Sequence, residues 1–89
     1  MLTKEVDIIN KLGLHARAAA KFVTCASRYT SDVKVEFNRR EVNGKSIMGV
    51  MMLAASRGTN IVITTRGEDE QEAANRLENL VQGKFGEAE

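Results

Sequence analysis

The sequence has little of several features that would direct it to particular functions. It has one cysteine, so no disulfide can form within the chain and the fold must depend on packing, as in a reducing compartment such as the cytoplasm. A net charge of +1 and an aromatic content of 4% argue against a nucleic-acid binder, including a small RNA-binding domain. No apolar run approaches the roughly 20 residues of a membrane span, and the first residues lack the apolar segment of a signal peptide. We therefore expect a cytoplasmic protein that neither binds nucleic acid nor inserts into a membrane.

What the sequence does contain is enough for one small domain. The 89 residues are 43% hydrophobic, which suffices for one core, and 28% charged. No internal repeat, linker or low-complexity segment interrupts them. We expect a single domain over residues 1–89.

The spacing of apolar residues predicts seven elements in the order β-α-β-β-α-β-α. Alternation predicts strands over residues 2–9, 33–38, 41–43 and 60–66. Helices are expected from Ala16 to about Arg28, from Ile47 to about Ala55, and from the acidic start at residues 68–70 to Gly83. Amphipathic helices of this kind must cover one face of a four-stranded antiparallel sheet, which gives a two-layer α+β open-faced sandwich. The tail, residues 84–89, is expected to fray.

Each long helix should bury one apolar stripe. In the first helix the inward stripe is expected to comprise Ala19, Phe22, Val23 and Ala26. In the last helix the corresponding stripe is Ala73, Leu77, Leu80 and Val81. Small side chains in the first stripe would let that helix lie close to the sheet.

The only histidine, His15, lies between a glycine turn and the alanine-rich first helix. The first N–H groups of a helix have no intrahelical partner, and the macrodipole makes that end positive. A neutral imidazole is a nucleophile, and Arg17 can pair with two phosphoryl oxygens. We therefore predict that His15 carries a phosphoryl group, held by Arg17 and by the backbone N–H groups of residues 16–18 (Ala16, Arg17 and Ala18). The alternative is that His15 only shapes the turn and Arg17 is a solvated side chain.

The second predicted helix begins after Ser46, which is typical of an N-cap. A short helix on a sheet buries one side only, so Val50 and Leu53 should reach the core. The outward side chains are then Ile47, Met48 and Met51, and flexible methionines suit a surface that docks several partners. The alternative for each methionine singly is a place in the core.

Three basic residues, Lys21, Arg28 and Lys45, are expected to form a rim that steers acidic partners, or else a solvated face. Cys25 is expected to be a small buried filler. With one cysteine and one histidine, no metal site can be built from these two residue types, and we expect neither a metal nor a cofactor.

Two motifs carry a resemblance that covers nearly the whole chain: the stretch Gly13–Arg17, and Gly44–Met48 at the start of the second helix; Gly67–Glu70 supports them. With these the chain resembles the HPr family, the histidine-containing phosphocarriers of the bacterial phosphoenolpyruvate-dependent phosphotransferase system. The resemblance implies that Nδ1 of His15 takes a phosphoryl group from enzyme I and passes it to an enzyme IIA-type acceptor, assisted by Arg17. Such a carrier is a stoichiometric component rather than an enzyme, and we expect it to be monomeric. The resemblance also implies regulatory phosphorylation of Ser46 by a dedicated serine kinase.

The chain departs from the family pattern at Ala18, where proline is common. Alanine keeps the backbone donor that proline lacks, so we expect this residue to tune the transfer rate without abolishing function. The alanine is also compatible with a carrier of the nitrogen-related branch of the system, as an alternative to sugar uptake. A rival reading is a non-phosphorylated regulatory module on the same fold, controlled through Ser46. The presence of His15 together with Arg17 favours the carrier.

Overall fold

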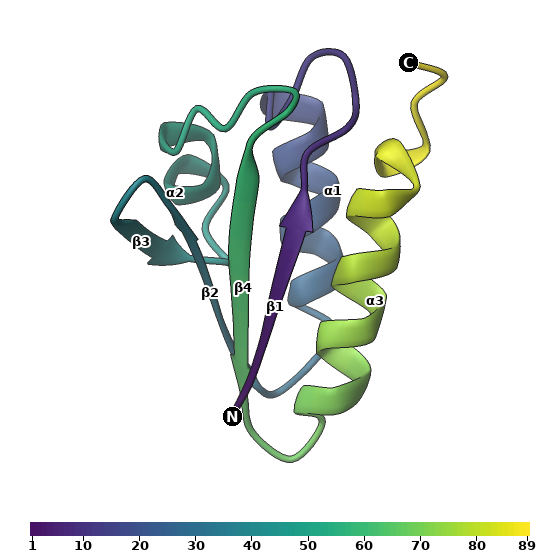
Figure 1. The fold of residues 1–89 in the computed structure, drawn as a ribbon. Coiled ribbons are helices and arrows are strands. Elements are labelled where there is room, and N and C mark those ends of the chain that lie inside the picture. Colours follow the sequence, from purple (N-terminus) through teal and green to yellow (C-terminus); the bar gives the residue numbers. More distant parts are fainter.

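The computed structural model describes residues 1–89 and contains a four-stranded sheet with its helices on one face (Figure 1). Neighbouring strands are antiparallel, in the order β1-β4-β2-β3. The strands are β1 (Leu2–Asp7), β2 (Asp32–Phe37), β3 (Arg40–Asn43) and β4 (Asn60–Arg66). The helices are α1 (Ala16–Ala26), α2 (Ile47–Met52) and α3 (Glu70–Gln82), followed by the short 3₁₀ helix η1 (Lys84–Gly86). The predicted element order and fold class are confirmed.

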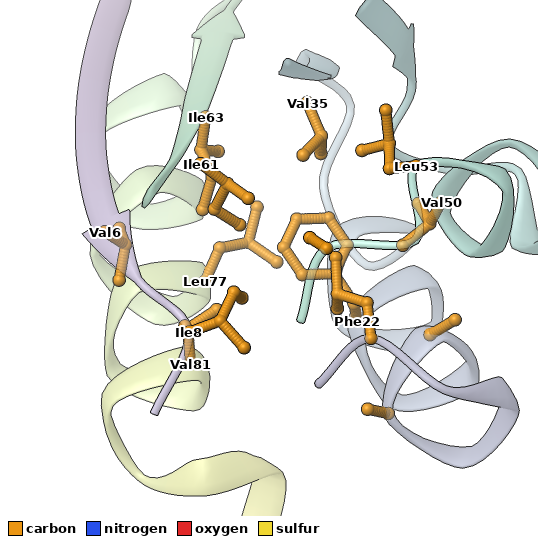
Figure 2. Packing of buried hydrophobic residues seen from close by; sticks show 14 of the residues in the cluster. Val6, Ile8, Phe22, Val35, Val50, Leu53, Ile61, Ile63, Leu77 and Val81 are labelled. Atoms are coloured by element: carbon orange, nitrogen blue, oxygen red, sulfur yellow. The ribbon is translucent and has the colours of Figure 1, made fainter. Parts of the chain in front are cut away.

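Alternation along the strands decides which side chains reach the core. In β4, Ile61 and Ile63 are fully buried, whereas Val62 between them is half-buried. Val35 of β2 lies opposite Ile63, and Val6 of β1 lies opposite Ile61, so apolar side chains from three strands share one face. That face points towards the helices (Figure 2).

The core joins this sheet face to the helices. Phe22 of α1 and Leu77 of α3 point towards each other and towards Ile61, while Val50 of α2 closes the other side (Figure 2). All four side chains are fully buried, and full burial of a large apolar side chain contributes about 1.5–3 kcal/mol. The start of α1 is therefore held in place by packing along the rest of that helix.

Helix α1 is rotated slightly from the predicted orientation. Ala18 is fully buried beside Ala19 and Phe22, whereas Val23 is only half-buried. The same shift occurs in α3, where Ala74 is fully buried and Leu80 is half-buried. In both helices an alanine is thus buried where the prediction placed a larger side chain.

Helix α2 is shorter than predicted. It ends at Met52 rather than near Ala55, because Ala54 takes a left-handed conformation with φ of 53°. The chain leaves the helix there, and the carbonyl of Ala55 accepts a hydrogen bond from the N–H of Leu14 at 2.9 Å. The early end of α2 thus helps to hold the loop that precedes α1.

Helix α3 begins at a clamp on the loop between α1 and β2. The carboxylate of Asp69 accepts hydrogen bonds from the N–H groups of Thr30 at 2.9 Å and Ser31 at 3.0 Å, and also from the Ser31 hydroxyl. These bonds, above all the one from the Ser31 hydroxyl, lower the pKa of Asp69 to about 2. The Asp69 carboxylate therefore binds a loop distant in the sequence and makes no side-chain cap bond in α3.

The expectation that residues 84–89 fray is wrong. Phe85 is only 1% exposed, and its carbonyl accepts a hydrogen bond from the Lys21 ammonium group at 2.7 Å. Further along, the backbone N–H of Lys11 donates to the carbonyl of Glu89. Burial of the Phe85 ring stabilises the tail enough to hold Phe85 itself at a positive φ of 56°. The tail consequently runs past the start of α1.

Candidate functional site

His15 is the N-cap residue of α1, with φ of −73° and ψ of 178°. Its imidazole makes no capping hydrogen bond, and the side chain is 27% exposed. The preceding residues hold it there: Leu14 is buried, and Gly13 has φ of 66°. A Cβ atom at Gly13 would lie 2.5 Å from the carbonyl oxygen of Ala55, so only glycine fits this turn. The predicted glycine turn therefore has a steric reason.

The first N–H groups of α1 make no hydrogen bond within the chain, and those of Ala16 and Arg17 belong to exposed residues, whereas Ala18 is fully buried. The first hydrogen bond across the helix start runs from the N–H of Ala19 to the carbonyl of His15, at 2.8 Å. The N–H groups of Ala16, Arg17 and Ala18 precede it and have no acceptor in the chain. Together with the helix macrodipole they favour negative charge beside the imidazole.

Arg17 lies where it can contribute positive charge to the same place. His15, Arg17 and Leu12 line one open depression of about 700 Å³. Arg17 is exposed and takes part in none of the ion pairs of the chain. Its guanidinium group is thus available to an incoming anion.

The structure adds two residues that sequence reasoning missed. Nε2 of His15 lies 2.5 Å from Oε2 of Glu87, and Oε1 of the same carboxylate accepts a hydrogen bond from Nδ2 of Asn10 at 3.0 Å. These two hydrogen bonds, chiefly the one from Asn10, lower the pKa of Glu87. Asn10 and Glu87 are 77 positions apart, so no local pattern could pair them. The one available signal was Phe85, an aromatic residue in an otherwise polar tail.

Ser46 is confirmed as the N-cap of α2. Its hydroxyl oxygen accepts a hydrogen bond from the N–H of Gly49 at 3.1 Å. Helix α2 packs against α1, on the same side of the sheet (Figure 1). The side chain of Ser46 is half-buried, at the edge of the helical layer.

The predicted division of α2 into two faces is also confirmed. Val50 and Leu53 are buried, whereas Ile47, Met48 and Met51 are 44%, 66% and 36% exposed. Four further large apolar side chains are exposed and were not predicted to be: Met1, Ile9, Leu12 and Met52, of which Leu12 is 66% and Met52 59% exposed. Because Leu12 lines the depression at His15, apolar surface borders this site as well.

The basic side chains expected to form a rim are arranged unequally. The ammonium groups of Lys21 and Lys45 donate to the carbonyls of Phe85 and Tyr29, each at 2.7 Å. Arg28 is exposed and lines a second depression on α1 together with Arg17. Arg28 is therefore freer to meet a partner than either lysine.

Cys25 is half-buried, rather than fully buried as predicted, and partial burial raises the pKa of its thiol. No three His, Cys, Asp or Glu side chains lie close enough together to hold a metal ion. None of the helices is long and apolar enough to cross a bilayer.

The geometry can be compared with known proteins. A family model described as the PTS HPr component phosphorylation site matches residues 2–83. The phosphocarrier protein HPr of Neisseria meningitidis is 56% identical over 89 residues, which is 100% of each chain. The HPr-like protein Crh of Bacillus subtilis is 50% identical over 82 residues, which is 92% of this chain and 96% of that relative. The crystal structure of HPr-C-His from Thermoanaerobacter tengcongensis superposes with a TM-score of 0.96 at 45% identity, covering 100% of both chains.

A nucleophilic ring at an open helix start, on a two-layer sandwich of this topology, defines a small phosphocarrier domain. The chain belongs to the HPr family. It is a phosphoryl carrier of the phosphotransferase system and not an enzyme, as the sequence predicted.

Proposed function

We propose that His15 is the phosphoryl acceptor, that enzyme I is the donor and that an enzyme IIA-type domain is the next acceptor. The observation that carries this proposal is the juxtaposition of a partly exposed imidazole, three unpartnered N–H groups and an unpaired guanidinium at the start of α1. The N–H groups of Ala16, Arg17 and Ala18 would bind phosphoryl oxygens, and Arg17 would pair with two of them.

The same features suit a carrier, which must release what it accepts. Positive potential at the helix start favours the phosphoryl dianion once it is attached to the ring. The site is an open depression rather than a closed cavity, so a second protein can reach the phosphorus atom in line. Binding that was much tighter would slow the second transfer.

The direct test is incubation with phosphoenolpyruvate and purified enzyme I, followed by tandem mass spectrometry. We expect one phosphoryl group on His15, labile in acid and stable in base, as a phosphoramidate is. The label should pass to an enzyme IIA domain on mixing. A stable adduct on another residue, or none, would overturn the assignment.

We further propose that Ile47, Met48 and Met51 form the docking surface for both partners, with Arg28, Lys21 and Lys45 as weaker electrostatic contributors. The support is the exposed apolar face of α2, a helix that packs against α1. Exchange of Met48 for serine should weaken binding to enzyme I, whereas the same exchange at Met1, far from α2, should not.

Ser46 is proposed as a regulatory phosphorylation site for a serine kinase. A phosphate at this N-cap would be favourable to the dipole of α2, so its effect would be repulsion of partners rather than unfolding. Incubation with such a kinase and ATP, followed by mass spectrometry, tests this. The rival reading is a regulatory module that is not phosphorylated at His15. The similarity to Crh, described as a catabolite repression HPr, fits a regulatory role, whereas the open site around His15 and Arg17 favours the carrier.

We propose that residues 1–89 act as one domain and as a monomer in the cytoplasm. A single cluster of 17 buried residues joins the apolar face of the sheet to the helices, and the one thiol is free. Analytical ultracentrifugation tests the oligomeric state. Either branch of the system, sugar uptake or nitrogen regulation, fits this proposal.

A further inference from the structure

The two ring nitrogens of His15 have different surroundings. Nε2 faces the carboxylate of Glu87 at 2.5 Å, whereas Nδ1 has no hydrogen-bond partner in the chain. An ionised carboxylate has acceptors only, so in the neutral ring the shared proton must be on Nε2. Nδ1 then keeps its lone pair.

The orientation of Glu87 is set by a buried amide. Asn10 is fully buried, and its Nδ2 donates both to the carbonyl of Gly13 at 2.9 Å and to Oε1 of Glu87 at 3.0 Å. Because the Gly13 carbonyl can only accept, the Asn10 amide cannot be turned over without placing two oxygens together. Position 87 must therefore offer an acceptor to Asn10.

The tail holds this carboxylate in place from both sides. Before Glu87, the Phe85 ring is buried and its carbonyl is bound by Lys21. After Glu87, the carbonyl of Glu89 is bound by the backbone N–H of Lys11. The carboxylate is thus presented to the ring by a docked segment and not by a free end.

We infer that Glu87, oriented by Asn10, is a positioning residue that keeps the His15 proton on Nε2 and so leaves Nδ1 as the nucleophile. This inference rests on the proposed role of His15. In the transfer step the Nδ1 lone pair forms the bond to phosphorus, and the donor's leaving atom keeps the electrons of the bond that breaks. The Nε2 proton stays in place, and the positive charge that develops on the ring is offset by the Glu87 carboxylate.

The sharpest test is Glu87→Gln. The carboxylate has two acceptors, one for Asn10 and one for His15, whereas an amide has one acceptor and one donor. With Asn10 fixed, the new amide oxygen faces Asn10 and the new NH₂ group faces His15. Nε2 must then accept, and the proton moves to Nδ1, which blocks the nucleophile.

We expect this change in ¹⁵N NMR spectra of the neutral ring. In the parent protein Nδ1 should show the shift of an unprotonated nitrogen, and in Glu87→Gln the protonated nitrogen should be Nδ1. Phosphoryl uptake from phosphorylated enzyme I should slow by about tenfold or more, as the loss of a charge-assisted hydrogen bond predicts. Glu87→Ala, which admits water to Nε2, should slow uptake less than Glu87→Gln.

The matched control is Glu68→Gln, the same chemical change at an exposed carboxylate before α3 that has no contact with His15. It should leave both the ring shifts and the uptake rate unchanged. The inference would be overturned if Glu87→Gln kept the proton on Nε2. It would also be overturned if Glu87→Gln and Glu87→Ala took up the phosphoryl group at the same rate, because a contact that only holds the tail predicts equal losses of uptake rate in the two variants. If the parent protein takes up no phosphoryl group at all, the proposed function fails, while the ring shifts still decide the role of Glu87.

Discussion

Helices α1 and α2 begin in opposite ways, although they pack side by side. At α2, the Ser46 hydroxyl accepts the N–H of Gly49, so the protein itself satisfies part of the helix start. At α1, the N-cap side chain is His15, which makes no capping bond and turns to Glu87 instead. One helix start is closed for stability and the other is left open for a ligand.

The difference between the two helix starts shows where the fold can leave backbone N–H groups without an acceptor. Helix α1 is anchored along its length by fully buried residues such as Ala18 and Phe22, so it does not depend on a side-chain cap. Helix α2 has six residues and only Val50 fully buried, so each capping bond matters more. A long, well-packed helix can afford an open end, and a short one cannot.

The largest effect on function is expected for His15→Ala, which tests whether the start of α1 serves phosphoryl transfer rather than stability. Phosphoryl uptake from enzyme I should be lost completely, because no other histidine is present. The free energy of unfolding should change by only about 1 kcal/mol, the value of one hydrogen bond, because the ring neither caps α1 nor lies in the core. Uptake assays and urea denaturation of the same preparation check both parts. Residual uptake with unchanged kinetics would mean that the open helix start serves another acceptor.

At the other helix start, Ser46→Ala should act on stability. Loss of the hydrogen bond to Gly49 should lower the free energy of unfolding by about 0.5–2 kcal/mol, as for other N-caps. Ser46→Asp is the matched control, since aspartate caps as well as serine and suits the helix dipole. Equal losses in the two variants would show that something other than capping is measured.

A third helix start, that of α3, predicts a pH effect. The pKa of Asp69 is lowered from 3.8 to about 2, so within this window the folded chain binds fewer protons than the unfolded chain. The stability that this carboxylate contributes is therefore complete above its ordinary pKa and is lost as the pH falls through about 2.

Urea denaturation of the parent protein and of Asp69→Asn, at several pH values between about 2 and about 6, tests this effect. The difference in unfolding free energy should be largest at the upper end and shrink in acid. A difference that does not depend on pH would show that the carboxylate charge is not involved.

The smallest effect is expected for Ala18→Pro. The N–H of Ala18 lies before the first hydrogen bond of α1, so proline removes one free donor and no helical bond. The uptake rate should change by less than about tenfold, because two other N–H groups and Arg17 remain. Ala20→Pro, within the bonded part of α1, is the control and should cost about 3 kcal/mol of stability. Uptake that is absent in the parent and appears only with proline would contradict this account.

Local patterns were enough for much of the fold and for half of the site. The alternation Ile61-Val62-Ile63 identified a strand and its buried face, and serine before an apolar run identified the start of α2. His15 and Arg17 could be found because both lie within one turn of the same helix. Each of these signals depends on neighbours in the sequence.

The rest depends on contacts between distant segments. The exact rotation of α1, which buries Ala18 rather than Val23, is set by the helices packed against it, α2 and α3. Asn10 and Glu87 meet only because Phe85 finds a place in the core, and nothing in the polar tail itself indicates that place. Polar residues outside any helix or strand pattern, such as Asn10 and Glu87, can thus form a contact that the sequence does not indicate.

The docked tail also has a practical consequence for how this protein is labelled. The two chain ends lie at opposite ends of the molecule (Figure 1), and Glu89 is hydrogen-bonded to Lys11 and lines the same depression as His15. A fluorophore or affinity peptide fused behind Glu89 would emerge at the proposed phosphoryl-acceptor site. One fused ahead of Met1 would leave that site undisturbed.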